Sequence, residues 1–389
     1  MSLNSVISIL GRRLRLAVIG GGPGSFIGPM HRLAARMDDQ FEIVTGVLSS
    51  NPDRARRASA ELGFAPDRIH TEVIEMLDAE LNRADAVDAV AIMTPNDSHL
   101  AYAVSALDRG FDVICDKPMT NTVQEAETLH QKVLDTGLVF CLTHNYTGYA
   151  MVRQAKAMVA EGQLGTIRLV QVEYVQGGKA DESKPDPMEK WRFVPGRGGP
   201  SLVMGDIGTH AHNLVRFVTG LEVAEVAAEV GAIVPNRRVH DFAGAMLRFG
   251  NGARGSFWVT QAAAGVENSL RFRISGTQGS LEWLQEMPQV LTFKPLGAPA
   301  ETRTPNGPGT LPLAQRACRV KAGHPGGFAE GFANLYTDAA EAIAARRAGQ
   351  PADPLVLHFP NSFDGLMGVR FIQAVLESSD ANGKWVKCS

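Results

Sequence analysis

The fold is decided by one stretch near the start of the chain, Leu14-Arg15-Leu16-Ala17-Val18-Ile19-Gly20-Gly21-Gly22-Pro23-Gly24-Ser25-Phe26-Ile27-Gly28. Its first six residues are typical of a buried strand, and the glycines follow directly. Such a turn between a first strand and a first helix suits a dinucleotide pyrophosphate, because glycines allow positive φ and a helix N-terminus offers free N–H groups. A plain glycine-rich turn is the alternative interpretation of this motif alone.

The spacing of the glycines departs from the usual dinucleotide-binding pattern at one position. Gly20 and Gly22 fit the first two places, but Ser25 occupies the third, so Gly28 is the candidate for the missing small residue. Pro29 is typical of a first helical position, which predicts that the helix begins at Gly28.

The first part of the chain alternates between strand-like and helix-like segments. After the first strand, the clearest strand candidates are 41–48, 87–93, 111–115 and 138–142. We expect six strands alternating with helices over about 140 residues, which predicts a doubly wound parallel sheet of the Rossmann type.

Polar residues follow the expected strands at the edge where ligands of such sheets bind. Ser49 and Ser50 end the second strand, where an acidic residue would favour NAD and an arginine would favour NADP. Both serines are neutral and Arg54 lies further along, so we expect NAD, with NADP the less favoured cofactor. The cluster Thr94-Pro95-Asn96-Asp97-Ser98-His99 lies at the end of the third of these strands.

The same edge presents a lysine beside a proline. The apolar run 111–115 leads directly into Asp116-Lys117-Pro118. Pro118 holds Lys117 in an extended conformation, which fixes where its side chain leaves the backbone. A solvated lysine on a turn is the alternative.

The pattern changes beyond Thr143-His144-Asn145-Tyr146. A helix over 149–161 and an alternating strand over 167–175 precede a loop, 177–200, that is rich in glycine, proline and basic residues. A loop of this length is usually functional or mobile, and a solvated basic surface is the alternative. Its basic and aromatic residues are Lys179, Lys184, Lys190, Trp191, Arg192 and Arg197.

Glycine turns in the second half predict hairpins. The segments 241–249 and 253–260 flank Gly250-Asn251-Gly252, and 271–276 and 280–284 flank a second glycine turn. We therefore predict an α/β protein with a Rossmann domain at 1–145 and an α+β domain at 146–389. The second domain is expected to contain a large, mostly antiparallel open sheet, with helices on one face and a partner subunit against the other.

An aspartate and a histidine four residues apart open a helix within Gly205-Asp206-Ile207-Gly208-Thr209-His210. On a regular helix both side chains leave from one face, and a carboxylate beside an imidazole orients it as a general base. A helix cap or a surface pair is the alternative. No third ligand lies nearby in the sequence, so we predict no metal.

The overall composition excludes several classes of protein. The chain has 389 residues, enough for two domains, and 44% are hydrophobic. Its 38 basic and 41 acidic residues are balanced, which argues against nucleic acid as a partner. The chain has no long apolar run, no secretory cleavage pattern and four scattered cysteines, so we expect a cytoplasmic protein that does not bind a membrane.

With these segments in order, the sequence resembles the glucose–fructose oxidoreductase/inositol dehydrogenase/MocA family of sugar and polyol oxidoreductases. The resemblance covers nearly the whole chain. It rests on the glycine turn at 20–28, on Asp116-Lys117-Pro118 where the family commonly has Glu-Lys-Pro, and on Gly205-Asp206-x-Gly208-x-His210. The 143–146 motif, the long glycine loop and His324-Pro325-x-Gly327 are similar to the branch with levoglucosan and scyllo-inositol dehydrogenases.

The resemblance implies roles for individual residues. His210 takes the proton from the hydroxyl that is oxidised, Asp206 orients His210, and Lys117 stabilises the reacting oxygen. The implied cofactor contacts are Gly20, Gly22, Pro23, Gly24, Ser25, Phe26, Ile27, Ser49, Ser50, Arg54, Thr94, Pro95, Asn96, His99, Asp116, Lys117 and Asn145. The implied substrate contacts are Lys117, His144, Tyr146, Lys179, Trp191, Arg192, Asp206, His210 and His324.

Three functions are compatible with these residues. The first is an NAD(P)-dependent sugar or polyol dehydrogenase, expected as a homodimer or homotetramer through its second sheet. The second is an NAD-dependent glycosidase that oxidises C3, eliminates, adds water and reduces again. The basic loop suits an anionic sugar in either case. A sugar-responsive NAD-binding regulator is the third, and the intact acid/base pair argues against it.

Overall fold

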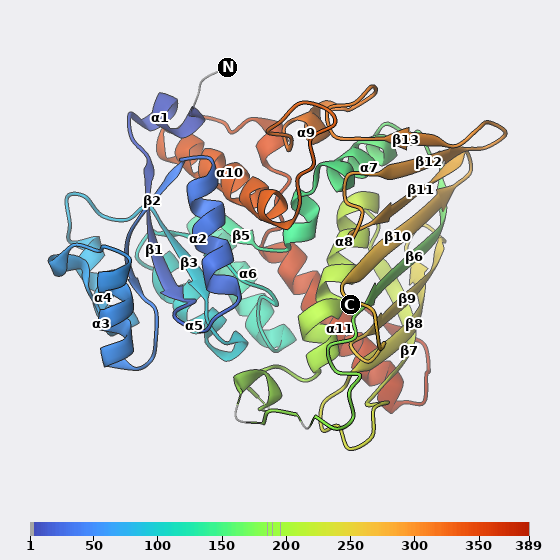
Figure 1. Ribbon diagram of the computed structural model, residues 1–389, viewed down its shortest axis with the longest axis horizontal. Helices are drawn as coiled ribbons and strands as arrows, with labels where there is room; N and C mark the ends of the chain where they lie inside the picture. Colours follow the sequence, from blue (N-terminus) through green and yellow to red (C-terminus); the bar gives the residue numbers. More distant parts are fainter. Residues whose placement is uncertain (1–3, 185, 189, 195, 389) are drawn as a thin grey trace. The chain divides into compact units, whose positions relative to one another are not determined.

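The computed structural model describes residues 4–184, 186–188, 190–194 and 196–388, which form two compact units (Figure 1). The first unit comprises Met1–Thr120, Gln124–Asn145 and Phe332–Gly365. The second comprises Asn121–Val123, Tyr146–Gly331 and Leu366–Ser389. A late helix therefore returns to the first unit.

The first unit is built on a parallel sheet with strand order β2-β1-β3-β4-β5. The strands are almost entirely buried, which explains their continuous apolar sequences. The sheet has five strands, so the expectation of six was wrong. Beside β2, Ile69 forms only an isolated parallel bridge to Gly46. The bounds are β1 Leu14–Gly20, β2 Phe41–Val47, β3 Ala89–Met93, β4 Asp112–Cys115 and β5 Phe140–Leu142.

Helices flank this sheet, as the doubly wound topology requires. The last of them, α10, packs on α2 through Tyr336, whose hydroxyl lies 2.8 Å from Nδ1 of His31. Its end is fixed by an ion pair between Arg346 and the buried Asp112. The helices are α1 Ser5–Leu10, α2 Ile27–Met37, α3 Pro52–Glu61, α4 Val73–Leu81, α5 His99–Leu107, α6 Val123–Thr136 and α10 Phe328–Arg347, with short 3-10 turns at η1 Pro66–Arg68, η2 Asn96–Ser98 and η6 Pro354–Val356.

The second unit is built on a nine-stranded sheet with order β13-β12-β11-β10-β6-β9-β8-β7-β14. All neighbours are antiparallel except β6 and β9, and both predicted hairpins, β8–β9 and β10–β11, are confirmed. Helices α7, α8 and α11 cover one face of the sheet (Figure 1). The strands are β6 Ile167–Val175, β7 Val223–Gly231, β8 Phe242–Phe249, β9 Arg254–Thr260, β10 Ser269–Gly276, β11 Gly279–Leu284, β12 Leu291–Pro295, β13 Glu301–Arg303 and β14 Val386–Lys387. The remaining elements are η3 Asn145–Gly148, α7 Ala150–Ala160, η4 Trp191–Phe193, η5 Met204–Gly208, α8 Thr209–Thr219, α9 Pro312–Gln315 and α11 Ser362–Asp380.

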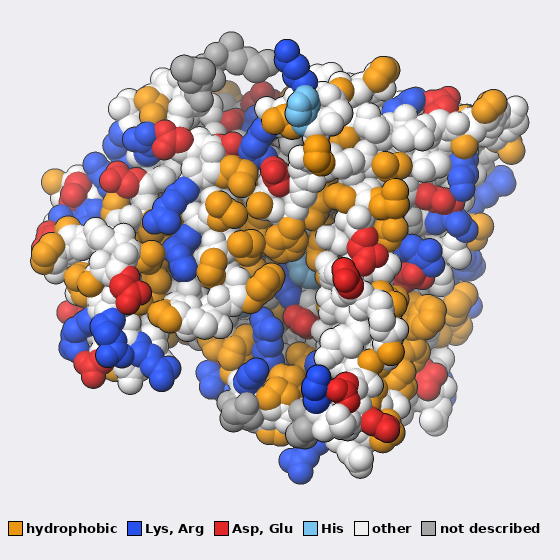
Figure 2. Space-filling view, in the orientation of Figure 1, with side chains coloured by type: hydrophobic (Ala, Val, Ile, Leu, Met, Phe, Trp, Pro, Cys, Tyr) orange, Lys and Arg blue, Asp and Glu red, His pale blue; other side chains and the backbone are white. Residues whose placement is uncertain are grey.

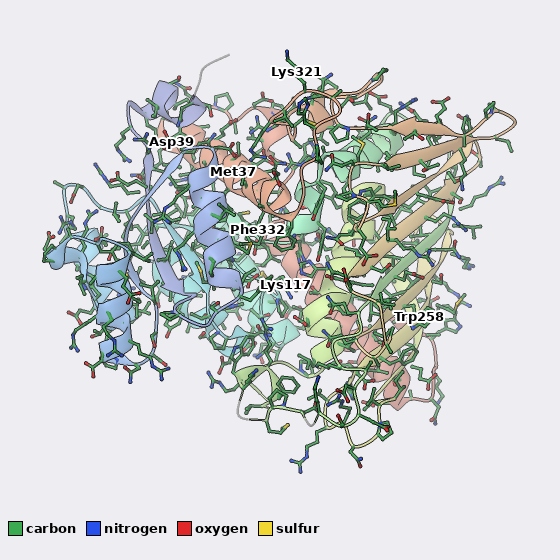
Figure 3. The ribbon with its side chains drawn as sticks, viewed as in Figure 1. Met37, Asp39, Lys117, Trp258, Lys321 and Phe332 are labelled. Atoms are coloured by element: carbon green, nitrogen blue, oxygen red, sulfur yellow. The ribbon has the colours of Figure 1, made fainter. Side chains whose placement is uncertain are left out.

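The two faces of this sheet differ in exposure. Alternate residues of β6, β8 and β9 point toward the helices and form one hydrophobic core with them. On the opposite face Leu169, Met246 and Trp258 are 55%, 54% and 50% exposed, and Figure 3 shows Trp258 on the side away from the helices. We refer to these three residues as the outer apolar patch.

Within the described part of the chain, no helix combines the length and the apolar character needed to span a bilayer.

Candidate active site

The glycine turn after β1 has the geometry that its sequence predicts. Gly20, Gly21 and Gly24 have φ of +81°, +66° and +86°, a region that favours glycine. A Cβ on Gly28 would lie 1.9 Å from the carbonyl oxygen of Gly21, and one on Gly22 would lie 2.1 Å from that of Leu48. Gly28 is therefore a close-approach glycine, as expected for the residue that replaces the third glycine of the pattern.

The helix behind this turn begins at Ile27, one residue before the predicted start, with Pro29 as its third residue. Its N-cap is Phe26, which provides no side-chain cap, and no acidic residue lies in the first turn. The N–H of Gly28 donates to Oγ of Ser25 at 3.2 Å, and because the first turn has no acidic residue, the positive end of the helix remains suited to an anion, as a pyrophosphate site requires. These features fit a dinucleotide.

The end of β2 carries the residues expected to bind the adenosine ribose. Ser49 Oγ accepts a hydrogen bond from the N–H of Asn51, and Asn51 caps α3. Three exposed arginines follow on α3, where basic side chains gather in Figure 2. They are Arg54, Arg56 and Arg57.

The loops after β3 and β4 are joined by one buried side chain. His99 places Nδ1 2.9 Å from the carbonyl oxygen of Pro118 and Nε2 3.1 Å from that of Thr94. Ser98 donates a hydrogen bond to the hydroxyl of Thr94. His99 therefore fixes the Thr94 turn relative to the lysine motif. Pro95 and Asn96 belong to the same turn, in which Asn96 is buried.

Lys117 leaves the carboxyl edge of the sheet from a tightly held backbone (Figure 3). Asp116 Oδ1 accepts hydrogen bonds from the N–H of Lys117, at 2.8 Å, and from the hydroxyl of Thr143, at 3.1 Å. The Lys117–Pro118 peptide is cis. The side chain of Asp116 is thus occupied with the backbone and the neighbouring strand, and it positions the lysine.

The segment after β5 is buried throughout. His144 and Asn145 are 2% and 3% exposed. Nδ2 of Asn145 is buried without a hydrogen-bond acceptor among the described residues. A buried amide donor of this kind is costly unless it binds something, which supports its predicted place among the ligand contacts.

Asp206 lies in a turn that the sequence did not predict. We expected a regular helix from Gly205, but Met204–Gly208 is a π-helical turn in which the N–H of Thr209 reaches the carbonyl oxygen of Met204. The assumption of regular helical spacing between Asp206 and His210 was therefore wrong over this turn. Such single π turns are frequent at functional sites. Asp206 Oδ2 accepts a hydrogen bond of 2.8 Å from Gln261.

His210 is buried and lies against aromatic side chains of the same unit. The ring of Tyr146 meets its imidazole edge-on, with centroids 4.9 Å apart. The hydroxyls of Tyr146 and Tyr174 are 2.5 Å apart, and Tyr174 donates to Asn268 at 2.8 Å. Burial raises the pKa of both tyrosines, so they remain neutral donors and acceptors beside the imidazole.

One basic residue of the 177–200 loop is turned inward. Nζ of Lys179 is buried, lies 4.7 Å from the centroid of Phe193 and has no hydrogen bond to the described residues. Burial lowers the pKa of Lys179 to about 8, although the carboxylates of Asp206 and Asp186 oppose the shift. The loop is held by Arg237, which donates 2.8 Å hydrogen bonds to the carbonyl oxygens of Lys179 and Asp181.

The other predicted substrate contacts are more peripheral. Arg192 is exposed, with its guanidinium 5.2 Å from the ring of Trp191. His324 is exposed, and its Nδ1 lies 3.1 Å from the carbonyl oxygen of Lys321. Among the residues that the structure describes, no three His, Cys, Asp or Glu side chains are grouped as metal ligands would be.

Sequence reasoning missed several residues that surround Asp206 and the basic loop. Gln261 directly follows β9, so its place after the predicted strand 253–260 was a usable signal. Arg237 gave no such signal, because it lies more than fifty residues along the chain from Lys179 and Asp181, whose carbonyl oxygens it binds. The others are Tyr174, Gln176 and Asn268.

Comparisons with known proteins agree with this geometry. Residues 14–144 match the family described as an oxidoreductase family with an NAD-binding Rossmann fold, and residues 152–282 match the GFO/IDH/MocA C-terminal domain. The crystal structure of an oxidoreductase from Sinorhizobium meliloti superposes on this chain with a TM-score of 0.88 and 44% sequence identity. The match covers 97% of this chain and 100% of the other.

Two further relatives carry more informative descriptions. An inositol dehydrogenase homolog complexed with NAD+, from Azotobacter vinelandii, is 33% identical with a TM-score of 0.90 over 97% of each chain. Levoglucosan dehydrogenase of Pseudarthrobacter phenanthrenivorans is 29% identical over 69% of this chain and 73% of its own length. These matches confirm the resemblance found in the sequence.

Proposed function

The chain belongs to the GFO/IDH/MocA family of NAD-binding oxidoreductases, and we propose that it transfers hydride between a secondary hydroxyl of a sugar or polyol and nicotinamide. The observation that carries the proposal is the carboxylate of Asp206, which the buried amide of Gln261 binds in a π-helical turn four residues before the buried His210. Relatives described as an inositol dehydrogenase homolog and as levoglucosan dehydrogenase support this substrate class.

In this proposal His210 removes the proton of the hydroxyl. Its imidazole is packed against the ring of Tyr146, which limits its rotation. A carboxylate beside an imidazole stabilises the positive charge that the imidazole gains in the reaction, which is the role proposed for Asp206. A positioned base of this kind accelerates proton transfer by about 10²–10⁴-fold.

Lys117 is proposed to donate a hydrogen bond to the reacting oxygen. Its cationic Nζ would stabilise the negative charge that develops there as the proton leaves. Asp116 accepts the backbone N–H of Lys117 and thereby defines where the lysine leaves the backbone. Bound NAD+ would supply the hydride acceptor for the carbon that carries the reacting hydroxyl.

The proposed cofactor residues are those of the β1, β2 and β3 ends. The glycine turn would hold the pyrophosphate of the cofactor, and Ser49 and Ser50 would bind its adenosine ribose. Thr94 to Asn96 would contact the portion of the cofactor that lies at the carboxyl edge of the sheet. NAD remains our proposal over NADP, although the arginines of α3 lie close in sequence to Ser50. Titration of both cofactors by intrinsic fluorescence, with the Arg54→Ala variant, tests it; tighter binding of NADP than of NAD would reject it.

Lys179 is proposed to contact an anionic or strongly hydrogen-bonding group of the substrate. Its buried amine without a hydrogen bond to the described residues is the support, whereas Lys190, Arg192 and Arg197 are exposed. Single replacement of each of the four should weaken binding of an anionic sugar most at Lys179. If all four variants bind the anionic sugar as tightly as wild type does, the proposed contact is rejected.

The outer apolar patch supports our proposal of a homodimer or homotetramer formed through the second sheet. Leu169, Met246 and Trp258 expose large apolar side chains on a flat sheet face, where a partner would remove them from water. Trp258→Glu is expected to lower the particle mass measured by light scattering, and an unchanged mass would exclude this face as the interface.

The cytoplasmic location and the domain division between residues 145 and 146 also remain predictions.

The dehydrogenase and glycosidase alternatives are separated by one incubation. The protein is mixed with NAD+ and a glycoside in deuterated water. Accumulation of NADH without cleavage supports a dehydrogenase. Release of sugar with deuterium at C2 and no net NADH supports the glycosidase and would reject our proposal.

A further inference from the structure

A buried amide connects Asp206 to the sheet of the second unit. Nε2 of Gln261 donates to Asp206 Oδ2 at 2.8 Å and to Oε1 of Gln176 at 3.2 Å. Both partners are acceptors, so the amide nitrogen, and not its oxygen, must face the carboxylate. Gln261 is 5% exposed.

The backbone of Gln261 is itself fixed on both sides. Its N–H donates to the carbonyl oxygen of Asp241 at 2.9 Å, and its carbonyl oxygen accepts from the N–H of Lys179 at 2.8 Å. The residue therefore joins the end of β9 to the start of the basic loop. A side chain anchored in this way can hold Asp206 in one orientation.

Beyond Gln261, a series of hydrogen-bonded side chains extends to Tyr146, whose ring packs against His210. Gln176 donates to Asn268 Oδ1 at 2.7 Å, and the same oxygen accepts from Tyr174 at 2.8 Å. The hydroxyl of Tyr174 is hydrogen-bonded to that of Tyr146, whose ring lies against His210. One polar network thus contacts both Asp206 and the ring that faces His210.

We propose that Gln261 is a positioning residue that fixes the catalytic carboxylate of Asp206 through its amide hydrogen bond. The inference rests on the proposed function, because it assigns Gln261 a part in the same proton transfer. The amide orients the carboxylate, because its N–H donates to one carboxylate oxygen from a fixed position. Gln261 itself touches no reacting atom in this account.

Several titratable groups face the same region and contribute to any pH profile. Lys179 approaches from the basic loop, Tyr146 from η3, Tyr174 from β6 and His210 from α8. A profile measured on one variant therefore mixes their effects. Comparison of variants that differ only at position 261 removes the shared contributions.

The test compares Gln261→Leu and Gln261→Glu with a matched control, Gln154→Leu. Gln154 is also buried in the same unit, but its amide binds the backbone of Gly309 and Leu311. Gln261→Leu is expected to lower kcat by about 10–100-fold, with little change in KM, since it removes a hydrogen bond to a charged group. Gln154→Leu should lower the melting temperature and leave kcat nearly unchanged.

Gln261→Glu provides the readout that a purely structural role would not produce. At neutral pH the introduced carboxylate repels Asp206, so kcat should fall further than in Gln261→Leu. As the pH falls and the introduced carboxylate takes up a proton, it becomes a donor again, and the ratio of the variant's kcat to that of wild type should rise. A pH-independent ratio would overturn the proposal.

A double-mutant cycle separates this inference from the function on which it rests. In an Asp206→Asn background, Gln261→Leu should cost less than about twofold, because the carboxylate that it orients is gone. If Asp206→Asn abolishes turnover but Gln261→Leu matches wild type, the inference is wrong and the proposed function stands. If Asp206→Asn, His210→Ala and Lys117→Ala all keep wild-type turnover, the proposed function fails and the inference fails with it.

Discussion

The helix that carries His210 contains a second histidine whose burial predicts a strong pH dependence of stability. His212 lies 4.3 Å from the ring of Phe371 in a stacked arrangement and is 5% exposed. Burial lowers its pKa to about 3, with a smaller contribution from the charge of Arg216. In the unfolded chain the pKa of a histidine is about 6.5.

The sign and size of the effect follow from the two pKa values. The folded state keeps His212 neutral, whereas the unfolded state takes up a proton below about pH 6.5, so stability is lost as the pH falls from there toward 3. At about pH 4.5 the imidazole of the unfolded chain is about two pH units below its pKa. At about 1.36 kcal/mol per unit, His212 alone then lowers the free energy of unfolding by about 2.7 kcal/mol.

The perturbation that isolates this contribution is His212→Leu. Urea unfolding of wild type and variant, followed between about pH 8 and pH 4.5, gives the difference in free energy of unfolding at each pH. The variant is expected to be less stable near pH 8, since it loses the stack on Phe371, and to gain about 2.7 kcal/mol relative to wild type by pH 4.5.

A matched control keeps the histidine and disturbs the same contact. Phe371→Leu should lower stability by a similar amount at every pH, because His212 remains buried and neutral. A difference between wild type and His212→Leu that stays constant from about pH 8 to 4.5 would refute the reasoning.

Three further predictions concern the cofactor turn, the basic loop and the sheet. Gly28→Ala should weaken NAD binding more than about tenfold, because its Cβ would lie 1.9 Å from a backbone oxygen, whereas Gly250→Ala, with open space around it, should bind normally in the same fluorescence titration. Binding of an anionic substrate should weaken as the pH rises through about 8, where Lys179 loses its charge, and Lys179→Met should abolish this pH dependence in a KM profile. Met246→Lys should reduce self-association in sedimentation runs without changing the melting temperature by more than a few degrees, and an unchanged sedimentation coefficient would count against the sheet interface.

The sequence predicted those features that local patterns determine. Buried strands, alternating strands and glycine turns depend on neighbouring residues, and β6 was predicted with its observed bounds, Ile167–Val175. The glycine turn was found for the same reason. The role of Gly28 was suggested by spacing alone, and its physical cause is the approach of the Gly21 carbonyl oxygen.

The features that the sequence did not predict depend on tertiary contacts. The π turn at Asp206 has no residue pattern that distinguishes it from a regular helix start. Gln261 reaches Asp206 from fifty-five positions away along the chain, through the packing of η5 against the end of β9. Arg237 and Lys179 are both basic, but in the folded chain Arg237 donates hydrogen bonds to backbone carbonyl oxygens, whereas the buried amine of Lys179 has none to the described residues.

In the proposed reaction, Lys117 and His210 are each required for the transfer of hydride from a hydroxyl-bearing carbon to NAD. This requirement is tested most directly by following NADH absorbance with a panel of sugars and polyols, for wild type and for Lys117→Ala and His210→Ala. Wild type should form NADH in proportion to oxidised substrate, and each variant should lose more than about a hundredfold in kcat, with NAD binding retained by His210→Ala. Wild-type rates in both variants would contradict it.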